Sequence, residues 1–286
     1  IEILSCKFRH SHLFFCFDSL LALGNPAPAA AALPTAAETA DAGFAIGKGT
    51  FLLKGQPFTV KAAELHYPRI PRDYWEHRIK MCKALGMNTI CIYIFWNIHE
   101  QQEGVFDFTG QNDVAEFCRL AQKNGMYVIV RPGPYVCAEW EMGGLPWWLL
   151  KKKDIKLRER DPYFMERVKI FEKKVAEQLA PLTIQRGGPI IMVQVENEYG
   201  SYGTDKPYVS AIRDMLKDNW YQNGRGPALF QCDWASTFER NALDDLVWTM
   251  NFGTGANIDE QFRRLDEVRP DAPKMCSEYW SGWFDR

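Results

Sequence analysis

Residues 187–200, GGPIIMVQVENEYG, join an apolar run to a pair of glutamates. The apolar half predicts a buried strand, and the glutamates lie at its carboxyl end. Side chains two residues apart in a strand share a face, so Gln194, Glu196 and Glu198 are expected on one face and the valines on the other. Carboxylates in such a strand cost desolvation free energy unless they are paired or take part in a reaction. The stretch therefore indicates a buried ion pair or an active site.

Six further runs share this design, in which an apolar strand ends in polar or aromatic residues: 58–67, 88–97, 126–133, 228–234, 246–253 and 273–280. Helical patterns lie between the runs, at residues 71–86, 112–125, 162–182, 206–224 and 258–270. Near-continuous apolar strands that alternate with helices indicate parallel strands covered on the outside. Both doubly wound sheets and (β/α)8 barrels have this pattern.

The ends of the predicted strands distinguish these two architectures. A barrel collects the carboxyl ends of its strands on one rim, where its active site lies. A doubly wound sheet favours a glycine-rich phosphate loop after its first strand, but residues 67–75, YPRIPRDYW, contain no glycine. We therefore predict an α/β chain with the (β/α)8 TIM-barrel fold, of which about seven of the eight strands are present.

The composition of the 286 residues is that of a globular protein, with 47% hydrophobic and 24% charged residues. It excludes a disordered tail, a collagen-like fibre and a disulfide-stapled miniprotein. The net charge of −2 provides no field for nucleic acid or anionic lipid. Aromatic residues reach 14%, which weakly favours a carbohydrate ligand. The body of the chain contains no run near the ~18 apolar residues of a membrane span.

Residues 1–43 differ from the rest of the chain. Lys7 and Arg9 precede the apolar runs LFFCF and SLLALG, and the small residues of PAPAAAALPTAA follow. This layout predicts a secretory signal peptide, interrupted by Asp18, and export to the periplasm, the extracellular space or the lysosome, depending on the source. A leader of another origin is the alternative. We expect two parts, a leader or disordered segment over 1–43 and a catalytic barrel over 44–286.

The cysteines and histidines do not predict a metal site. None of the eight cysteines forms a CxxC pair, which excludes zinc-ribbon and thioredoxin-like sites, so buried free thiols are expected, with a disulfide as the alternative in an exported protein. His66 and His99 lie near strand ends but have no HxH or HExxH spacing. We expect them to be hydrogen-bonded structural residues, and we expect no metal or cofactor.

A second carboxylate lies in residues 275–285, MCSEYWSGWFD. Glu278 has Tyr279, Trp280 and Trp283 nearby, which suggests a sugar-binding floor, although a core ion pair is possible. Glu198 and Glu278 lie on the fourth and seventh predicted strands, whose rims face each other across a small barrel. Two opposed carboxyl groups are what cleavage of a glycosidic bond requires.

Four segments together resemble the β-galactosidases of glycoside hydrolase family 35, over roughly residues 44–286. They are GGPIIMVQVENEYG, RPGPYVCAEWEMGGLPWWL (131–149), YIFWNIHE (93–100) and SEYWSGWFD (277–285). The resemblance implies a retaining, exo-acting hydrolase that releases terminal non-reducing β-D-galactose through a covalent galactosyl-enzyme. The carbohydrate with its terminal β-galactose is then the partner, without nucleic acid or a membrane span.

The resemblance also implies residue roles. Glu198 matches the proton donor of the family and Glu278 matches its nucleophile. The positions that line the galactose pocket are matched by Tyr93, Cys137, Ala138, Glu139 and Asn197. The family places tyrosines on its eighth strand and carries C-terminal β-rich domains, so we expect the barrel to be incomplete at the C-terminus of this chain.

Several alternatives stay open from the sequence. An exo-β-glucosaminidase of the same family would keep both glutamates, and a non-catalytic sugar-binding relative would not need the pair. Glu196 is predicted to be a buried partner rather than the acid. Trp147 and Trp148 either form a leaving-group subsite or pack the barrel. The charged run KKKD (151–154) is expected to be a solvated face.

Overall fold

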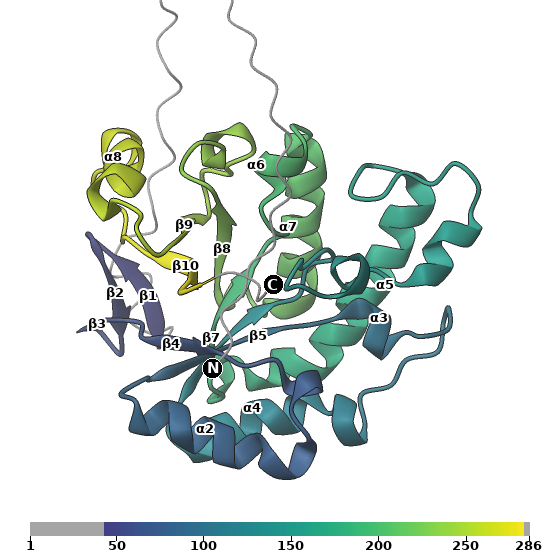
Figure 1. Cartoon of the computed structure of the whole chain (residues 1–286), viewed down its shortest axis with the longest axis horizontal. Helices are drawn as coiled ribbons and strands as arrows, with labels where there is room; N and C mark the ends of the chain where they lie inside the picture. Colours follow the sequence, from purple (N-terminus) through teal and green to yellow (C-terminus); the bar gives the residue numbers. More distant parts are fainter. Residues whose placement is uncertain (1–42, 283–286) are drawn as a thin grey trace, which may run out of the picture.

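The computed structural model describes residues 43–282, which form a curved parallel sheet with helices outside it and a small antiparallel sheet beside it (Figure 1). The predicted signal peptide, two of the cysteines (Cys6 and Cys16) and Trp283 lie outside the described residues.

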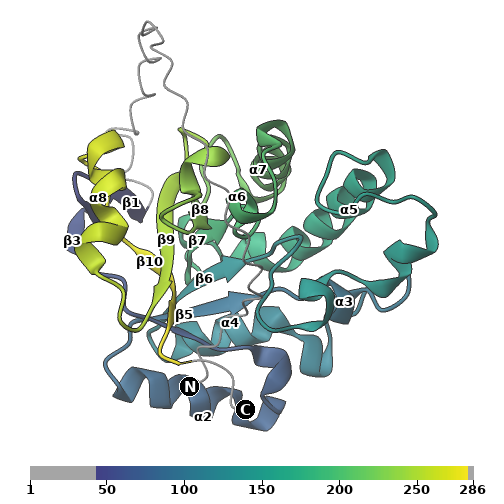
Figure 2. The ribbon, with the colours of Figure 1, turned by 45° about the horizontal axis from the view of Figure 1, so that its top comes forward.

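The parallel sheet contains the seven predicted strands, in sequence order from one edge to the other. They are β4 (Ala62–Glu64), β5 (Thr89–Tyr93), β6 (Tyr127–Arg131), β7 (Ile190–Gln194), β8 (Ala228–Asp233), β9 (Val247–Gly253) and β10 (Cys276–Trp280). Every neighbouring pair is parallel. The sheet curves around a central space, as an incomplete barrel does (Figure 2).

Helices connect the strands on the outside of the sheet. The longer ones are α2 (Trp75–Ala84), α4 (Val114–Lys123), α5 (Pro162–Leu179), α7 (Lys206–Trp220) and α8 (Ile258–Val268), and the single turns are α3 (Trp96–His99) and α6 (Tyr199–Tyr202). Four of them follow a side chain that accepts a backbone N–H of the first turn, which fixes where the helix begins: Asp113, Asp161, Asp205 and Asn257. None of the described helices is both long and apolar enough to cross a membrane.

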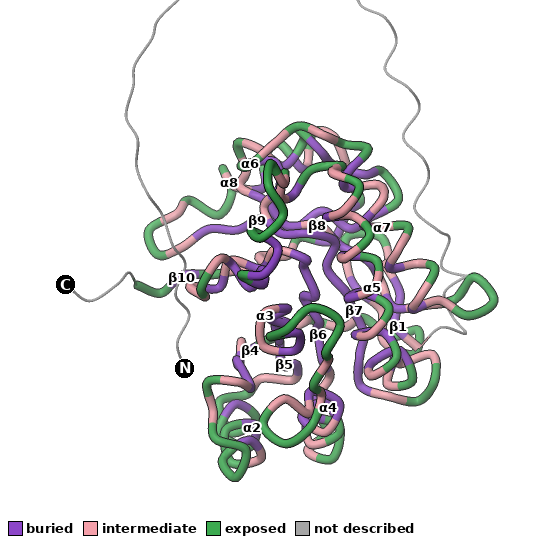
Figure 3. The backbone as a smooth tube through the Cα atoms, turned by 90° about the vertical axis from the view of Figure 1, so that its right-hand side faces the viewer, coloured by how far each residue is buried: buried purple, intermediate pink, exposed green. Residues whose placement is uncertain are grey.

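The main core lies between the helices and the outer face of the sheet. Ile92 and Val128 on the strands belong to one buried cluster with Phe117 of α4, Phe171 of α5 and Ile212 of α7. The buried backbone therefore follows the central strands (Figure 3). Because these strands are almost completely buried, they lack the alternation of apolar and polar residues that is typical of a sheet with one solvent-exposed face.

The segment 58–67, predicted as one strand, divides between two sheets. Phe58 ends β3 (Gln56–Phe58), which pairs with β2 (Thr50–Leu53), and β2 pairs with β1 (Phe44–Gly47), all antiparallel. Ala62–Glu64 instead pairs parallel with β5. The prediction of one strand over residues 58–67 was wrong, because a single straight strand cannot pair with two sheets that run in different directions. Phe44 and Phe51 of the small sheet pack in one buried cluster with residues of the parallel strands, among them Ile129 and Phe230.

Strands β4 and β10 form the two edges of the parallel sheet, and a seam separates them. A cavity of about 440 Å³ lies at this seam, between Glu64 of β4 and residues 276–279, with Phe51 and Phe58 among its lining residues. An eighth strand would close the barrel here. That strand is expected beyond Arg286 and stays a prediction.

The described cysteines are all free thiols. Cys82, Cys91, Cys118 and Cys232 are buried, which confirms the expected buried thiols for these four residues. Cys137 and Cys276 are half-buried; Cys137 lies in the segment after β6, and Cys276 is the first residue of β10.

Candidate active site

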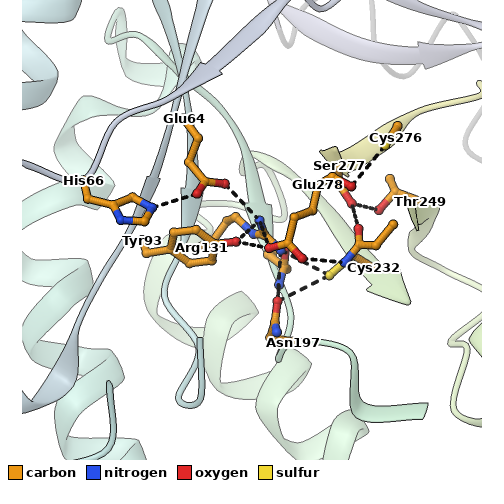
Figure 4. A network of polar contacts seen from close by, with 12 residues as sticks. Glu64, His66, Tyr93, Arg131, Asn197, Cys232, Thr249, Cys276, Ser277 and Glu278 are labelled. Carbon is orange, nitrogen blue, oxygen red and sulfur yellow. Dashed lines mark hydrogen bonds and ion pairs between the residues drawn. The ribbon is translucent and has the colours of Figure 1, made fainter. Parts of the chain in front are cut away.

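The carboxyl ends of the parallel strands bring polar side chains together in the centre of the barrel (Figure 4). Tyr93 ends β5 and pairs in register with Arg131 at the end of β6. Asn251 of β9 pairs in register with Glu278 of β10. Parallel pairing thus gathers residues that are far apart in the sequence onto one rim.

Glu278 lies in a pocket of donors. The Tyr93 hydroxyl donates to its Oε1, Arg131 Nη1 lies 3.2 Å from the same oxygen, and Asn251 Nδ2 donates to Oε2 at 3.2 Å. Burial raises the pKa of Glu278, while the Arg131 guanidinium and the Tyr93 hydroxyl act in the opposite direction. These donors favour the ionised carboxylate.

Glu198 faces the same space with less positive charge around it. Its backbone is left-handed, with φ of 45°, and its Oε1 accepts from Asn251 Nδ2 at 2.9 Å. Burial, followed by the nearby charge of Glu278, raises the pKa of Glu198 to about 7. Arg131 and Tyr93 contact Glu278 and not Glu198, so a proton shared by the pair is favoured on Glu198.

The two carboxyl groups share one donor. Asn251 Nδ2 lies 2.9 Å from Glu198 Oε1 and 3.2 Å from Glu278 Oε2. Because both distances start at the same nitrogen, the two oxygens lie within roughly 6 Å of each other. Asn251 is fully buried, and its Oδ1 accepts from the Ser277 hydroxyl at 2.9 Å, which restricts how the amide can turn.

The structure corrects the expected face of residues 194–198. Strand β7 ends at Gln194, and both Glu196 (φ 57°) and Glu198 (φ 45°) adopt the left-handed backbone. The alternation of a strand therefore does not extend to the glutamates, and they point to different partners. A left-handed residue other than glycine is uncommon and has no signal in the residue pattern.

Glu196 is a buried ion-pair partner, as predicted. Arg158 Nη2 lies 2.7 Å from its Oε2 and Arg158 Nε lies 3.1 Å from its Oε1. The Tyr208 hydroxyl donates to Oε1 at 2.9 Å. Arg158 also donates to the carbonyl of Asn197 at 2.6 Å, so this pair supports the backbone between the two glutamates.

The predicted sugar-binding residues surround the same space and carry unused polar atoms. Asn197 Oδ1 accepts from Arg131 Nη2 at 2.9 Å, whereas the buried Asn197 Nδ2 has no hydrogen-bond partner among the described residues. Glu139 Oε1 is likewise buried without such a partner. Burial, and then the charges of Glu278 and Glu64, raise the pKa of Glu139 to about 8. Unpartnered buried polar atoms need an explanation, and a polar ligand provides one.

Cys137, Ala138 and Glu139 form a left-handed turn, with φ of 57°, 53° and 47°. Ala138 is buried and Cys137 is half-buried. Tyr93, the remaining predicted pocket residue, is fully buried and bonded to Glu278. The structure thus brings all seven predicted site residues to one region, and their roles stay predictions.

Two central residues were missed by the sequence reasoning. Arg131 is fully buried, and its guanidinium contacts Tyr93, Gln194 and Glu278. Asn251 bridges the two glutamates. Both lie in strand-end motifs, RPGP and MNFG, so their position was the available signal.

The two histidines considered as metal ligands are held by hydrogen bonds within the fold. His99 Nδ1 bonds the Asp107 carbonyl at 2.8 Å, its Nε2 bonds the Tyr67 hydroxyl, and burial lowers the pKa of His99 to about 4. His66 is bonded to Glu64 and Arg69, so both histidines are hydrogen-bonded as expected. Within residues 43–282, no cluster of three or more His, Cys, Asp or Glu side chains is placed to hold a metal ion.

The aromatic candidates separate into packing and exposed residues. Trp148 is buried and donates to the Glu100 carbonyl at 2.8 Å, so it packs the fold. Trp147 is 56% exposed, and its leaving-group role stays a prediction. Tyr279 is exposed and lines the seam, while the Trp280 ring lies 4.6 Å from that of Trp234. The run 151–154 is exposed, as expected.

Two solved structures illustrate the similarity of the fold. An exo-β-1,4-mannosidase, Op5Man5 from Opitutaceae bacterium strain TAV5, matches 78% of this chain and 46% of its own with a TM-score of 0.62 and 14% identity. A GH5_18 structure from Bifidobacterium longum subsp. longum matches 71% of this chain and 53% of its own, with a TM-score of 0.52 and 13% identity. These likenesses support the fold alone, and they confirm the predicted barrel with seven strands.

Sequence relatives are much closer. A β-galactosidase of Xanthomonas manihotis is 43% identical over 266 residues, 93% of this chain and 43% of that protein. The β-galactosidases of Mus musculus and Homo sapiens are 45% and 43% identical over 82% and 83% of this chain, and over 36% and 35% of their own length. The chain thus spans less than half the length of these relatives. The sequence profile of glycosyl hydrolases family 35 matches residues 50–286. This chain belongs to glycosyl hydrolase family 35.

Proposed function

We propose that the protein carrying this chain is a retaining, exo-acting β-galactosidase that releases terminal non-reducing β-D-galactose. The observation that carries this proposal is the carboxyl pair joined by Asn251. Retaining glycosidases hold their two carboxyls about 5–5.5 Å apart, and inverting ones hold them about 6.5–9.5 Å apart. The bound of roughly 6 Å set by the shared donor supports the retaining geometry.

The unequal surroundings of the two carboxyls support one division of roles between them. Glu278, beside Arg131 and Tyr93, is the carboxylate that attacks the anomeric carbon while the bond to the leaving oxygen breaks. Glu198, whose pKa lies at about 7, gives its proton to that oxygen. In the second step Glu198 takes a proton from water, the water oxygen bonds the anomeric carbon, and Glu278 leaves as carboxylate.

The buried polar atoms of Asn197 and Glu139 that lack a partner are the groups that bind the sugar hydroxyls. Asn197 Nδ2 is available to donate to the 2-hydroxyl, a contact that strengthens as the transition state forms. The carboxyl of Glu139 is available to bind two hydroxyls of the galactose ring. A site that hydrogen-bonds particular hydroxyls rejects sugars that lack them, because its buried polar atoms are then left unpaired.

The test compares two substrates on the full-length protein. We expect a chromogenic β-galactoside to be cleaved at least roughly 100-fold faster, in kcat/KM, than the matching β-glucosaminide. NMR spectra of early time points should show β-galactose as the first product. A preference for the glucosaminide would favour the alternative exo-β-glucosaminidase. Galactose binding without hydrolysis of either substrate would favour a non-catalytic relative.

The pH dependence tests the proton assignment. Glu198 must be protonated for the first step, so kcat/KM for a galactoside with a poor leaving group should fall as pH rises through about 7, the pKa of Glu198. The pKa of Glu139, about 8, is close to that of Glu198, so the pH profile of the wild type alone does not identify the group. The variant Glu198→Gln identifies the group, because its residual activity should lose the alkaline limb near pH 7. A limb that persists in this variant would assign it to another residue.

A further inference from the structure

The turn that carries Glu139 is strained. Three consecutive residues without glycine, Cys137, Ala138 and Glu139, adopt left-handed backbone angles. Such conformations persist only where the surrounding structure holds them. Glu139 belongs to the proposed galactose pocket, so whatever holds the turn also sets the position of Glu139.

Arg69 holds this turn through hydrogen bonds to its backbone carbonyls. Its Nη2 donates to the carbonyl of Ala138 at 3.0 Å and to that of Glu139 at 2.8 Å. Its guanidinium also lies 4.8 Å from the centre of the Trp140 ring. One planar cation therefore contacts three successive residues, which a lysine ammonium could not reproduce.

A histidine and a glutamate orient Arg69 in turn. Arg69 Nη1 donates to His66 Nδ1 at 2.5 Å. Because a guanidinium only donates, His66 Nδ1 accepts, and the imidazole proton lies on Nε2. That nitrogen donates to Glu64 Oε1 at 2.7 Å. The imidazole is held edge-on by the rings of Tyr93 and Phe95, at 5.3 and 5.6 Å.

The same chain of contacts reaches Glu278. Glu64 Oε2 lies 3.5 Å from Arg131 Nη1, which lies 3.2 Å from Glu278 Oε1. Figure 4 shows this part of the chain, from His66 through Glu64 and Arg131 to Glu278. The sugar-binding turn and the proposed nucleophile are thus tied to one network.

We propose that Arg69 is a positioning residue: held by His66 and Glu64, it fixes the turn 137–139 so that Glu139 meets the galactose hydroxyls. This role rests on the proposed galactosidase function and adds a residue to it. Arg69 acts through Glu139 and has no role in the bond-breaking step. Its loss should therefore weaken sugar binding more than it slows turnover.

Arg72 provides a matched control. It lies three residues further on, donates to the Gly110 carbonyl and lies 5.3 Å from the centre of the Trp75 ring. Its contacts resemble those of Arg69, but they hold a different loop. The comparison of Arg69→Met with Arg72→Met, and of the two Lys variants, separates positioning of Glu139 from general support of the fold.

The experiment measures kcat, KM and the Ki of galactose in the full-length protein. We expect Arg69→Met to raise KM and Ki roughly tenfold or more with a smaller change in kcat, Arg69→Lys to lie between it and wild type, and both Arg72 variants to stay near wild type. In a Glu139→Gln background, Arg69→Met should add little, because both changes act at one contact. Unchanged KM and Ki, or effects that multiply fully, would overturn the positioning role.

A second measurement does not depend on activity. Hydrogen exchange of the amides in residues 137–144 should be faster in Arg69→Met or Arg69→Lys than in the corresponding Arg72 variant. Equal exchange would overturn the proposal even in a protein that binds no galactose. A wild-type protein without galactosidase activity would contradict the proposed function alone, and the exchange rates would still decide whether Arg69 holds the turn.

Discussion

Glu278→Gln is expected to lower kcat/KM for every β-galactoside by on the order of 10⁴-fold or more, because an amide cannot form the covalent galactosyl-enzyme. The substitution preserves the shape of the side chain. Arg131 keeps its contacts with Gln194 and Asn197, so the variant should remain folded. The large effect should therefore appear in catalysis and leave the melting temperature nearly unchanged.

A 2-fluoro galactoside with a good leaving group provides the direct measurement. Wild-type protein should accumulate a covalent adduct, visible as a mass increase on the peptide that contains Glu278, and Glu278→Gln should show no adduct. Glu172→Gln is a suitable control, because Glu172 is a buried carboxyl on α5 without a hydrogen-bond partner among the described residues. Labelling of Glu278→Gln, or labelling of wild type on another residue, would contradict the assigned nucleophile.

Glu198→Gln is expected to give a loss that depends on the leaving group. For an alkyl galactoside, which needs the proton, kcat should fall by roughly 10²–10⁴-fold. For a dinitrophenyl galactoside the first step needs no acid, so galactosyl-enzyme should form at nearly the wild-type rate. It should then accumulate, because the base that activates water is missing.

Azide distinguishes the loss of the catalytic base from a general loss of folded, active protein. It is a nucleophile that needs no base, so it should restore turnover of the activated substrate in Glu198→Gln and yield β-galactosyl azide. Wild type should gain nothing from azide. Equal losses on both substrates, without rescue, would remove Glu198 from the role of acid and base.

The barrel was predictable because its central parallel strands are buried on both faces. Runs such as residues 88–97 are apolar without alternation, and this pattern persists whatever lies next to the strand. The small antiparallel sheet was not predicted. Its strands have three or four residues, and their pairing depends on turns at Lys48–Gly49 and Lys54–Gly55 that the periodicity does not reveal.

The site was predictable in its carboxylates and less so in their surroundings. Glu198 follows an apolar strand and Glu278 lies within the last one, so their place on the rim could be inferred from local sequence. The contacts of Arg131 and Asn251 depend on which strand ends adjoin, a property of the assembled sheet. The opposite directions of Glu196 and Glu198 follow from left-handed backbone angles, for which the sequence has no local signal.

The crowded surroundings of Arg131 restrict how this site can evolve. One buried guanidinium contacts Tyr93, Asn197, Cys232 and Glu278 at once. A neighbour of different size or shape would shift this cation relative to the others, so the effects of two such substitutions will not add. Such epistasis means that a new sugar preference is more accessible through the peripheral turn at residues 137–139 than through the centre. Substitutions among Arg131 and its four neighbours are expected to be tolerated only in compensating combinations.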